Sequence, residues 1–219
     1  MRRIISAASL CLAAVLVVGT VSAFAARTPT PLTTEGVLQQ ETSLGDLVAD
    51  AIKDAGSAQA ALVNATQFKP GTIPEGKVTA GDISAWLIKP QRPWVVSNLT
   101  GECLKAALER SLSRAPQQSA HFLQVAGLRV VYDPKAAAGT RVTSLKVGGQ
   151  PVQDTATYRV AMPDDLAKGG SGYFTIPCFT ETTIQPGATG TLADAITAFV
   201  EAHATLDYSA LNRIEAAKP

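Results

Sequence analysis

Histidine is scarce in this chain, since only His121 and His203 occur among its 219 residues. Dinuclear metal hydrolases need several histidines and aspartates, because imidazole and carboxylate groups hold the two ions that activate water. The Asp-x-His and Asn-His pairs that could supply such ligands are also absent from the sequence. We therefore expect no metal site, no other cofactor and no catalytic residues of this kind in the chain.

Concentrated positive charge is missing as well. The 19 lysines and arginines are balanced by 18 acids, for a formal net charge of +1, and no segment gathers the bases. A surface that binds a polyphosphate backbone needs such a concentration of positive charge. We therefore expect no nucleic acid partner.

Only one long hydrophobic run occurs, from Ile4 to Val21, and it follows the positive start Met1-Arg2-Arg3. The segment Ala23-Phe24-Ala25 then has the small-x-small pattern that signal peptidase reads. We expect residues 1–25 to be a signal peptide, and the mature chain to be periplasmic or secreted, without membrane contact after cleavage. A retained membrane anchor is the alternative, because the run is close to the shortest length that spans a bilayer.

Cysteine is rare, with three in the whole chain, and Cys11 leaves with the signal peptide. Cys103 and Cys178 would remain in an oxidising compartment, where a disulfide is allowed but cannot be deduced from sequence. A disulfide and two separate half-buried thiols both stay open.

Hydrophobic residues are abundant, at 46% of the chain, which together with the low net charge favours a folded core over disorder. Residues 26–37 begin with a Thr/Pro-rich stretch that has no hydrophobic period, which is typical of an extended linker. We expect a single domain over residues 38–219.

Hydrophobic periodicity predicts the elements of this domain. Helices are expected from Ser43 to the stop signal at Gly56, around residues 82–87, from Gly101 to about residue 114, and over residues 192–203. Strands are expected over residues 60–63, 94–96, 123–132, 141–147 and 157–162. This irregular interleaving predicts an α+β fold in which a mixed β-sheet is layered with helices.

Several motifs occur along the chain with fitting intervals. They are Glu41-Thr42-Ser43-Leu44-Gly45-Asp46-Leu47-Val48-Ala49-Asp50-Ala51, Ala61-Leu62-Val63-Asn64, Leu99-Thr100-Gly101-Glu102, Phe122-Leu123-Gln124-Val125-Ala126-Gly127-Leu128, Tyr132-Asp133 and Leu166-Ala167-Lys168-Gly169-Gly170-Ser171-Gly172-Tyr173. Together they resemble the C-terminal domain of 5'-nucleotidases and UDP-sugar hydrolases, over residues 38–205. The resemblance implies the fold of that domain and a role in recognising the nucleoside part of a substrate. In the family a separate metallophosphoesterase domain performs hydrolysis, and we expect this chain to lack it.

The resemblance also implies a ligand site around the glycine-rich turn. Tyr173 matches one of two rings that grip the nucleobase in the family, and stacking on such a ring stabilises a complex by roughly 1–3 kcal/mol. Gly169, Gly170 and Gly172 would let the backbone turn tightly and a ligand approach. The alternative is that Tyr173 packs over a neighbouring strand and that the glycines serve the turn alone.

Three further positions complete the implied ligand site. Asn64 is retained from a family loop, and Lys69 replaces an arginine of that loop, which keeps the charge but loses the bidentate fork. The second family ring is lost at Lys89, and Trp94 is the substitute, with packing on its strand as the alternative. Trp86 is assigned to the core.

Other differences from the family weaken the expected nucleotide site. Gln40 stands where the family has an arginine, and Ser171 stands where it has an aspartate. Asp164 and Asp165 are interpreted as solvated loop acids rather than a general acid/base pair, because adjacent side chains point apart.

Three functions are consistent with these features of the sequence. The first is an exported recognition module for a nucleoside- or nucleotide-type small ligand, without its own catalytic metal centre. The second is the recognition subunit of a split nucleotide hydrolase that acts with a separate metallophosphoesterase. The third is a scaffold protein that keeps the fold but binds no ligand.

Overall fold

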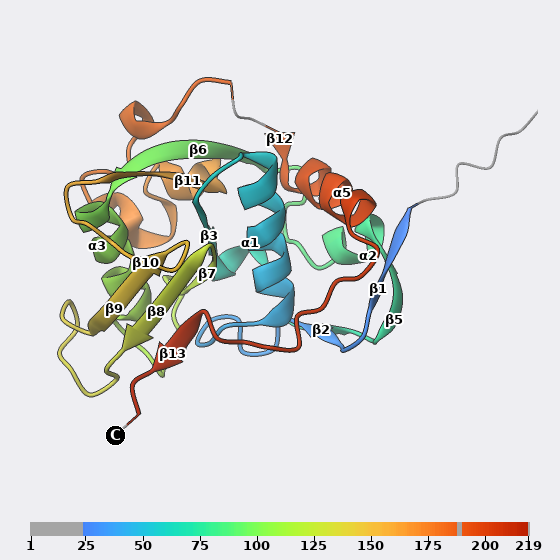
Figure 1. Ribbon diagram of the computed structural model, residues 1–219, viewed down its shortest axis with the longest axis horizontal. Coiled ribbons are helices and arrows are strands. Elements are labelled where there is room, and N and C mark those ends of the chain that lie inside the picture. The colour runs from blue at the N-terminus through green and yellow to red at the C-terminus, as the bar shows by residue number, and fades with distance from the viewer. Residues whose placement is uncertain (1–23, 188–189, 219) are drawn as a thin grey trace, which may run out of the picture.

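The computed structural model describes residues 24–187 and 190–218, and the expected signal peptide therefore lies almost wholly outside the described residues (Figure 1). A five-stranded sheet forms the centre, in the order β12 (Gly190–Thr191), β6 (Pro93–Thr100), β11 (Thr157–Pro163), β3 (Ala60–Asn64) and β7 (Leu123–Ala126). Strands β11 and β3 are parallel and the other neighbours are antiparallel. The sheet is therefore mixed, and the expected α+β fold is confirmed.

A second sheet holds four strands, in the order β10 (Gln150–Pro151), β9 (Val142–Val147), β8 (Leu128–Tyr132) and β13 (Ile214–Ala216). The sequence predicted one strand over residues 123–132, but the chain turns between β7 and β8 at Gly127, which has φ +69°. A Cβ atom there would lie 2.2 Å from the carbonyl oxygen of Gln59. Glycine thus lets the chain pass from one sheet to the other.

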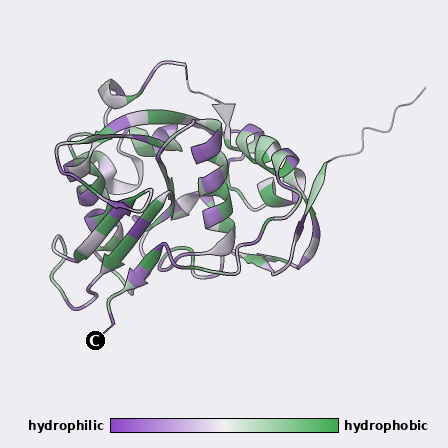
Figure 2. Cartoon of the chain, viewed as in Figure 1, coloured by the Kyte–Doolittle hydropathy of each residue, from purple (hydrophilic) through white to green (hydrophobic). Residues whose placement is uncertain are grey.

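Helix α1 (Ser43–Ala55) packs on β3 and β7 and against α5 (Leu192–Ala202), as Figure 1 shows. Its N-cap is Thr42, whose hydroxyl accepts a hydrogen bond from the amide of Gly45. Hydrophilic residues recur along α1 in Figure 2, although the first two turns of the helix, with the polar Ser43 and Asp46, are buried.

The remaining helices are α2 (Ala80–Ser84), α3 (Gly101–Leu112) and α4 (Asp164–Ala167), with short 3₁₀ turns at residues 65–67, 170–175 and 181–183. Thr79, Thr100 and Thr191 cap α2, α3 and α5 at the first turn. A disulfide joins Cys103 on α3 to Cys178, which decides between the two states that the sequence left open. No helix among the described residues is both long and apolar enough to cross a bilayer.

The segment expected to be a linker, residues 26–37, is extended but is built into the fold. Strand β1 (Ala25–Thr28) pairs with β5 (Gly76–Thr79), and β2 (Leu32–Thr33) pairs with β4 (Thr72–Ile73). Leu32 and Thr34 are fully buried, and the hydroxyl of Thr34 donates to the carbonyl of Lys69 at 2.6 Å. The low hydrophobicity of the segment concealed this role, because backbone pairing needs no apolar period.

The C-terminal segment is held against α1 by charged groups. The carboxylate of Glu41 accepts hydrogen bonds from the backbone amides of Asn212, Arg213 and Ile214 at 2.9–3.1 Å. The guanidinium of Arg213 contacts the carboxylate of Asp50 at 2.7 Å and that of Asp46 at 3.1 Å. These contacts deliver β13 to the edge of β8, a pairing that the sequence did not predict.

Candidate functional site

The glycine-rich turn follows α4 and reaches back to the end of β3. Gly169, Ser171 and Gly172 have φ values of +86°, +53° and +84°, so three residues occupy the left-handed region. A Cβ atom at Gly172 would lie 2.7 Å from the ring of His121, and one at Gly169 would lie 2.7 Å from the Cα atom of Phe174. The turn therefore requires glycine at both positions, for its backbone and for close packing.

Asn64 and the turn meet, as the sequence motifs implied. The amide nitrogen of Asn64 donates to the hydroxyls of Thr66 and Ser171, both at 2.9 Å. The two hydroxyls lie 3.1 Å apart, and the amide oxygen of Asn64 accepts a hydrogen bond from Gln67 at 3.3 Å. Asn64 is fully buried, so its amide holds the turn rather than reaching for solvent.

His121 fixes the turn from the opposite side. Its Nε2 lies 3.0 Å from Nη2 of Arg110, which can only donate, so Nε2 accepts and Nδ1 carries the proton. Nδ1 donates this proton to the carbonyl oxygen of Ser171, with 2.9 Å between the nitrogen and the oxygen. Burial, followed by the charges of Arg110 and Arg114, lowers the pKa of His121 and keeps the ring neutral. The sequence suggested no role for His121, because its partners come from α3 and the turn.

Tyr173 is placed differently from the stacking ring that the resemblance implied. Its side chain is fully buried, its hydroxyl donates to the carbonyl oxygen of His121 at 2.6 Å, and its ring packs against Phe179 with 5.2 Å between centroids. Burial raises the pKa of the phenol far above its ordinary value. The ring therefore has the packing role that was the alternative, and Phe174, beside it, is 75% exposed.

Trp94 and Lys69 also lie away from the turn. Trp94 is buried on β6, opposite Pro163 and Gly190, as strand packing required. The chain is extended at Phe68, so successive side chains alternate in direction. Phe68 and Pro70 face the cavity next to Asn64, whereas Lys69 lines another cavity and donates to the carbonyl of Ala85 at 2.8 Å.

Asp164 and Asp165 are not the free solvated acids that the sequence suggested. Arg92 contacts both carboxylates, at 3.3 Å and 3.4 Å, and Gln67 donates to Asp165 at 3.2 Å. Lys168 lies 3.8 Å from Asp164. These contacts neutralise the acids and anchor α4, which carries the turn.

A cavity of about 370 Å³ adjoins the network at Thr66. Its apolar lining includes Leu38, Phe68 and Ile88, while Glu35 and Gln118 supply polar groups. Ile88 is 52% exposed, within the loop where the family's second ring is lost. The loss of that ring could have directed attention to Ile88, whereas nothing local in the sequence marks Leu38 or Gln118. Among the described residues, no cluster of three histidine, cysteine or acidic side chains could hold a metal ion.

Comparison with known proteins places the chain in a family. A sequence profile of the 5'-nucleotidase C-terminal domain matches residues 17–181, and the chain belongs to this family. It is 31% identical over 197 residues to an apyrase of Aedes albopictus, covering 80% of this chain and 32% of that protein. It is 32% identical over 148 residues to the trifunctional nucleotide phosphoesterase protein YfkN of Bacillus subtilis, covering 64% of this chain and 10% of that protein.

The fold agrees with this membership. The crystal structure of a 5'-nucleotidase precursor from Thermus thermophilus superposes with a TM-score of 0.76 at 27% identity, covering 90% of this chain and 40% of that one. The chain thus spans between a tenth and two fifths of the length of these relatives.

Proposed function

We propose that this chain is an exported recognition domain for a nucleoside- or nucleotide-type small ligand, without a catalytic metal centre of its own. The observation that carries the proposal is a cavity of about 370 Å³ whose wall residue Thr66 is hydrogen-bonded to Asn64 and to Ser171 of the preorganised turn. Because these hydrogen bonds already fix Thr66, this part of the cavity wall needs little ordering when a ligand arrives. The names of its relatives, an apyrase and a nucleotide phosphoesterase, supply the ligand class.

The recognising groups differ from those that the sequence suggested. Neither Tyr173 nor Trp94 lines this cavity, so the apolar contact falls mainly to the exposed Ile88, and polar contact falls to Thr66 and Gln118. An aliphatic side chain stacks less well on a base than a second aromatic ring does, so we expect weak binding.

Calorimetry with adenosine, AMP and UDP-glucose tests the proposal. We expect heat with at least one ligand, lost in Ile88→Asp and kept in Leu211→Asp. Leu211 is the matched control, because it is 45% exposed and does not line the cavity. Absence of heat with all three ligands, or equal binding by both variants, would refute the proposal and leave the scaffold function.

A second candidate is a recognition subunit that acts with a separate metallophosphoesterase. It is favoured because the relatives are about two and a half to ten times longer than the part that this chain matches. Phosphatase assays with zinc, manganese or cobalt should show no AMP hydrolysis by the pure chain. Co-purification with a metallophosphoesterase, and hydrolysis by the pair, would favour this candidate over a stand-alone module.

A further inference from the structure

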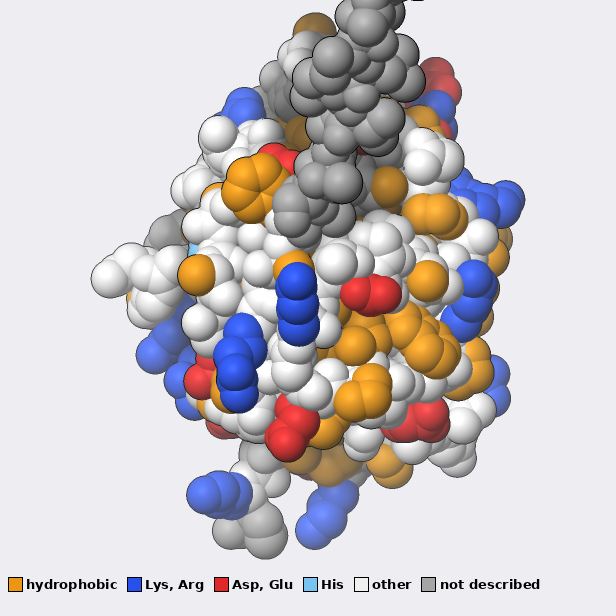
Figure 3. Space-filling model, turned by 90° about the vertical axis from the view of Figure 1, so that its right-hand side faces the viewer, with side chains coloured by type: hydrophobic (Ala, Val, Ile, Leu, Met, Phe, Trp, Pro, Cys, Tyr) orange, Lys and Arg blue, Asp and Glu red, His pale blue; other side chains and the backbone are white. Residues whose placement is uncertain are grey.

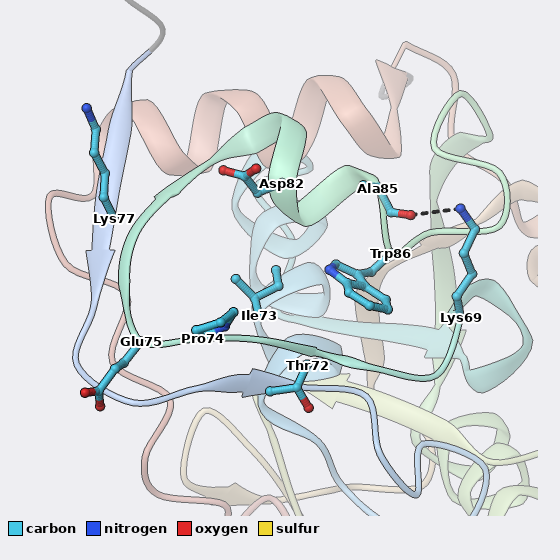
Figure 4. Close-up of a pocket in the computed structure, with 9 residues that line it drawn as sticks. All are labelled: Lys69, Thr72, Ile73, Pro74, Glu75, Lys77, Asp82, Ala85 and Trp86. Carbon is cyan, nitrogen blue, oxygen red and sulfur yellow. Dashed lines mark hydrogen bonds between the residues drawn. The ribbon is translucent and has the colours of Figure 1, made fainter.

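A second cavity, of about 530 Å³, lies between α2 and the β4–β5 segment (Figure 4). Trp86, just after α2, lines it together with Ile73, Pro74 and Ala85. Trp86 packs against the core, as the sequence assigned it, but its side chain is only partly buried and also reaches into this space. Figure 3 faces this side of the molecule and shows an orange hydrophobic area bordered by red and blue side chains.

The indole of Trp86 is held in place from one side by Gly71. A Cβ atom at Gly71 would lie 1.9 Å from Cζ3 of the indole, and Gly71 has φ +155°. Only glycine therefore lets the ring lie against the backbone there. Among the described residues, no hydrogen bond partner of the indole nitrogen of Trp86 is found. Because Trp86 is partly exposed, this N–H group can bind solvent or a ligand. The ring is thus a fixed platform with a free N–H donor.

Charges around the cavity are balanced. Lys69 and Lys77 supply donors, and Glu75 and Asp82 supply acceptors. Hydrogen bonds from the hydroxyl and backbone amide of Thr79 lower the pKa of Asp82, so this carboxylate is ionised at neutral pH. With two lysines and two carboxylates the lining carries no net charge and gives an anion no overall attraction, whereas hydroxyl groups both donate and accept and can pair with either sign of charge.

We propose that this cavity binds a neutral saccharide, with one face of a sugar ring stacked on Trp86 and its hydroxyls at the charged rim. The apolar C–H face of a sugar ring matches an indole face, while Ile73 and Pro74 enclose its edge. The site is separate from the one at Asn64, because Phe68 and Pro70 face one cavity and Lys69 the other. The proposal therefore stands independently of the proposed function.

The chain contains a natural reporter for this site. It has two tryptophans, and Trp94 is 5% exposed, so Trp94→Phe leaves Trp86 as the single tryptophan, which can be excited selectively. We would titrate this variant and the wild type with maltotriose, cellotriose and tri-N-acetylchitotriose, and with AMP. The concentration would reach about 10 mM, where a complex with a Kd of about 1 mM is mostly formed.

We expect a saturable change in Trp86 emission with at least one of the saccharides, and binding of AMP at least tenfold weaker at this site. By calorimetry, Trp86→Ala should abolish saccharide binding, and Glu75→Ala with Lys77→Ala should weaken it several-fold with the melting temperature unchanged. Ile88→Asp, at the other cavity, should leave it unaffected. No saturable change with any saccharide, tighter binding of AMP, or full binding by the rim variant would overturn the proposal.

Discussion

Two segments near the C-terminal end of the chain, residues 169–173 and 212–216, are bound to earlier parts of the chain by different kinds of contact. The turn at residues 169–173 is held by neutral hydrogen bonds from Asn64, His121 and Tyr173. The tail at residues 212–216 is held by polar groups of opposite charge, since Glu41 accepts from its backbone amides and the guanidinium of Arg213 contacts Asp50 and Asp46. In the neutral network each polar group has its own hydrogen-bond partner. In the charged cluster one guanidinium, that of Arg213, serves two acidic side chains, so its loss affects both.

The two networks also respond to pH in opposite directions. Burial, only partly offset by Arg213 and reinforced by Glu41 and Asp50, raises the pKa of Asp46 from 3.8 to about 9. The pKa of His121 is instead lowered from 6.5. The tail therefore weakens as the pH rises, and the turn weakens as the pH falls.

Breaking the charged cluster should have the largest effect. Arg213→Met removes the guanidinium from the half-buried carboxylate of Asp50 and from the fully buried carboxyl group of Asp46, and should lower the free energy of unfolding by about 3–5 kcal/mol. Urea denaturation measures this. Arg129→Met is the matched control, because Arg129 pairs with Glu215 at the surface and should cost under about 1 kcal/mol. Equal losses in the two variants would contradict a buried cluster.

Removing the disulfide should cause the second-largest loss in the free energy of unfolding. This variant tests whether the disulfide holds the segment that contains the turn. Cys103→Ser with Cys178→Ser opens a link across 75 residues and should cost about 2–4 kcal/mol. The amides of residues 170–179 should lose hydrogen-exchange protection before those of residues 212–216. Uniform loss of protection would show that the two segments unfold together.

A smaller loss is expected from Tyr173→Phe. It leaves the carbonyl oxygen of His121 buried without its donor, at a cost of about 1–3 kcal/mol. Tyr132→Phe is the control, because no hydrogen bond of its hydroxyl is found among the described residues, and it should be near neutral. A neutral Tyr173→Phe would mean that the ring, not the hydroxyl, fixes the turn.

The charged tail predicts a slope with pH. Since the folded pKa of Asp46 is raised, its stabilising contribution is complete below about pH 4 and is lost as the pH rises towards 9. The slope is at most about 1.4 kcal/mol per pH unit. Asp46→Asn should flatten the dependence of unfolding free energy on pH between about 6 and 9. An unchanged slope would show that Asp46 is ionised at neutral pH.

Protonation of His121 in the neutral network should have the smallest effect on the free energy of unfolding, and this effect should occur in acidic solution. Because the folded pKa of His121 is lowered, its contribution is present above pH 6.5 and is lost in more acidic solution. His121→Asn keeps a donor for Ser171 and cannot gain a proton, so it should reduce the loss of stability below pH 6.5. NMR titration of the imidazole checks the direction of the shift.

Local signals predicted much of the fold. The helix from Ser43 was predicted from its hydrophobic period and the stop signal at Gly56, and β3 and β11 were predicted as short strands. The pairing of strands was harder to predict from the sequence. Strand β13 has only three residues, too few for a periodic signal, and Glu41 and Arg213 hold it beside β8.

The candidate site was predicted only in part. The sequence brought Asn64 together with the turn, through motifs that lie far apart in the chain. It assigned Tyr173 and Lys69 to a ligand, but the direction of a side chain depends on neighbours that periodicity does not reveal. Tyr173 points into the core because its hydroxyl donates to the carbonyl oxygen of His121 and its ring packs against Phe179 there.

The sequence by itself determined the α+β class, the family, the extent of the helix that begins at Ser43, and the glycines of the turn, because these depend on local backbone preferences and on ordered motifs. The tertiary structure alone decided the Cys103–Cys178 disulfide, the inward placement of Tyr173, and the two cavities that Phe68 and Lys69 face. Such features arise from contacts between residues distant in sequence, whose energies depend on packing and burial that no local pattern records.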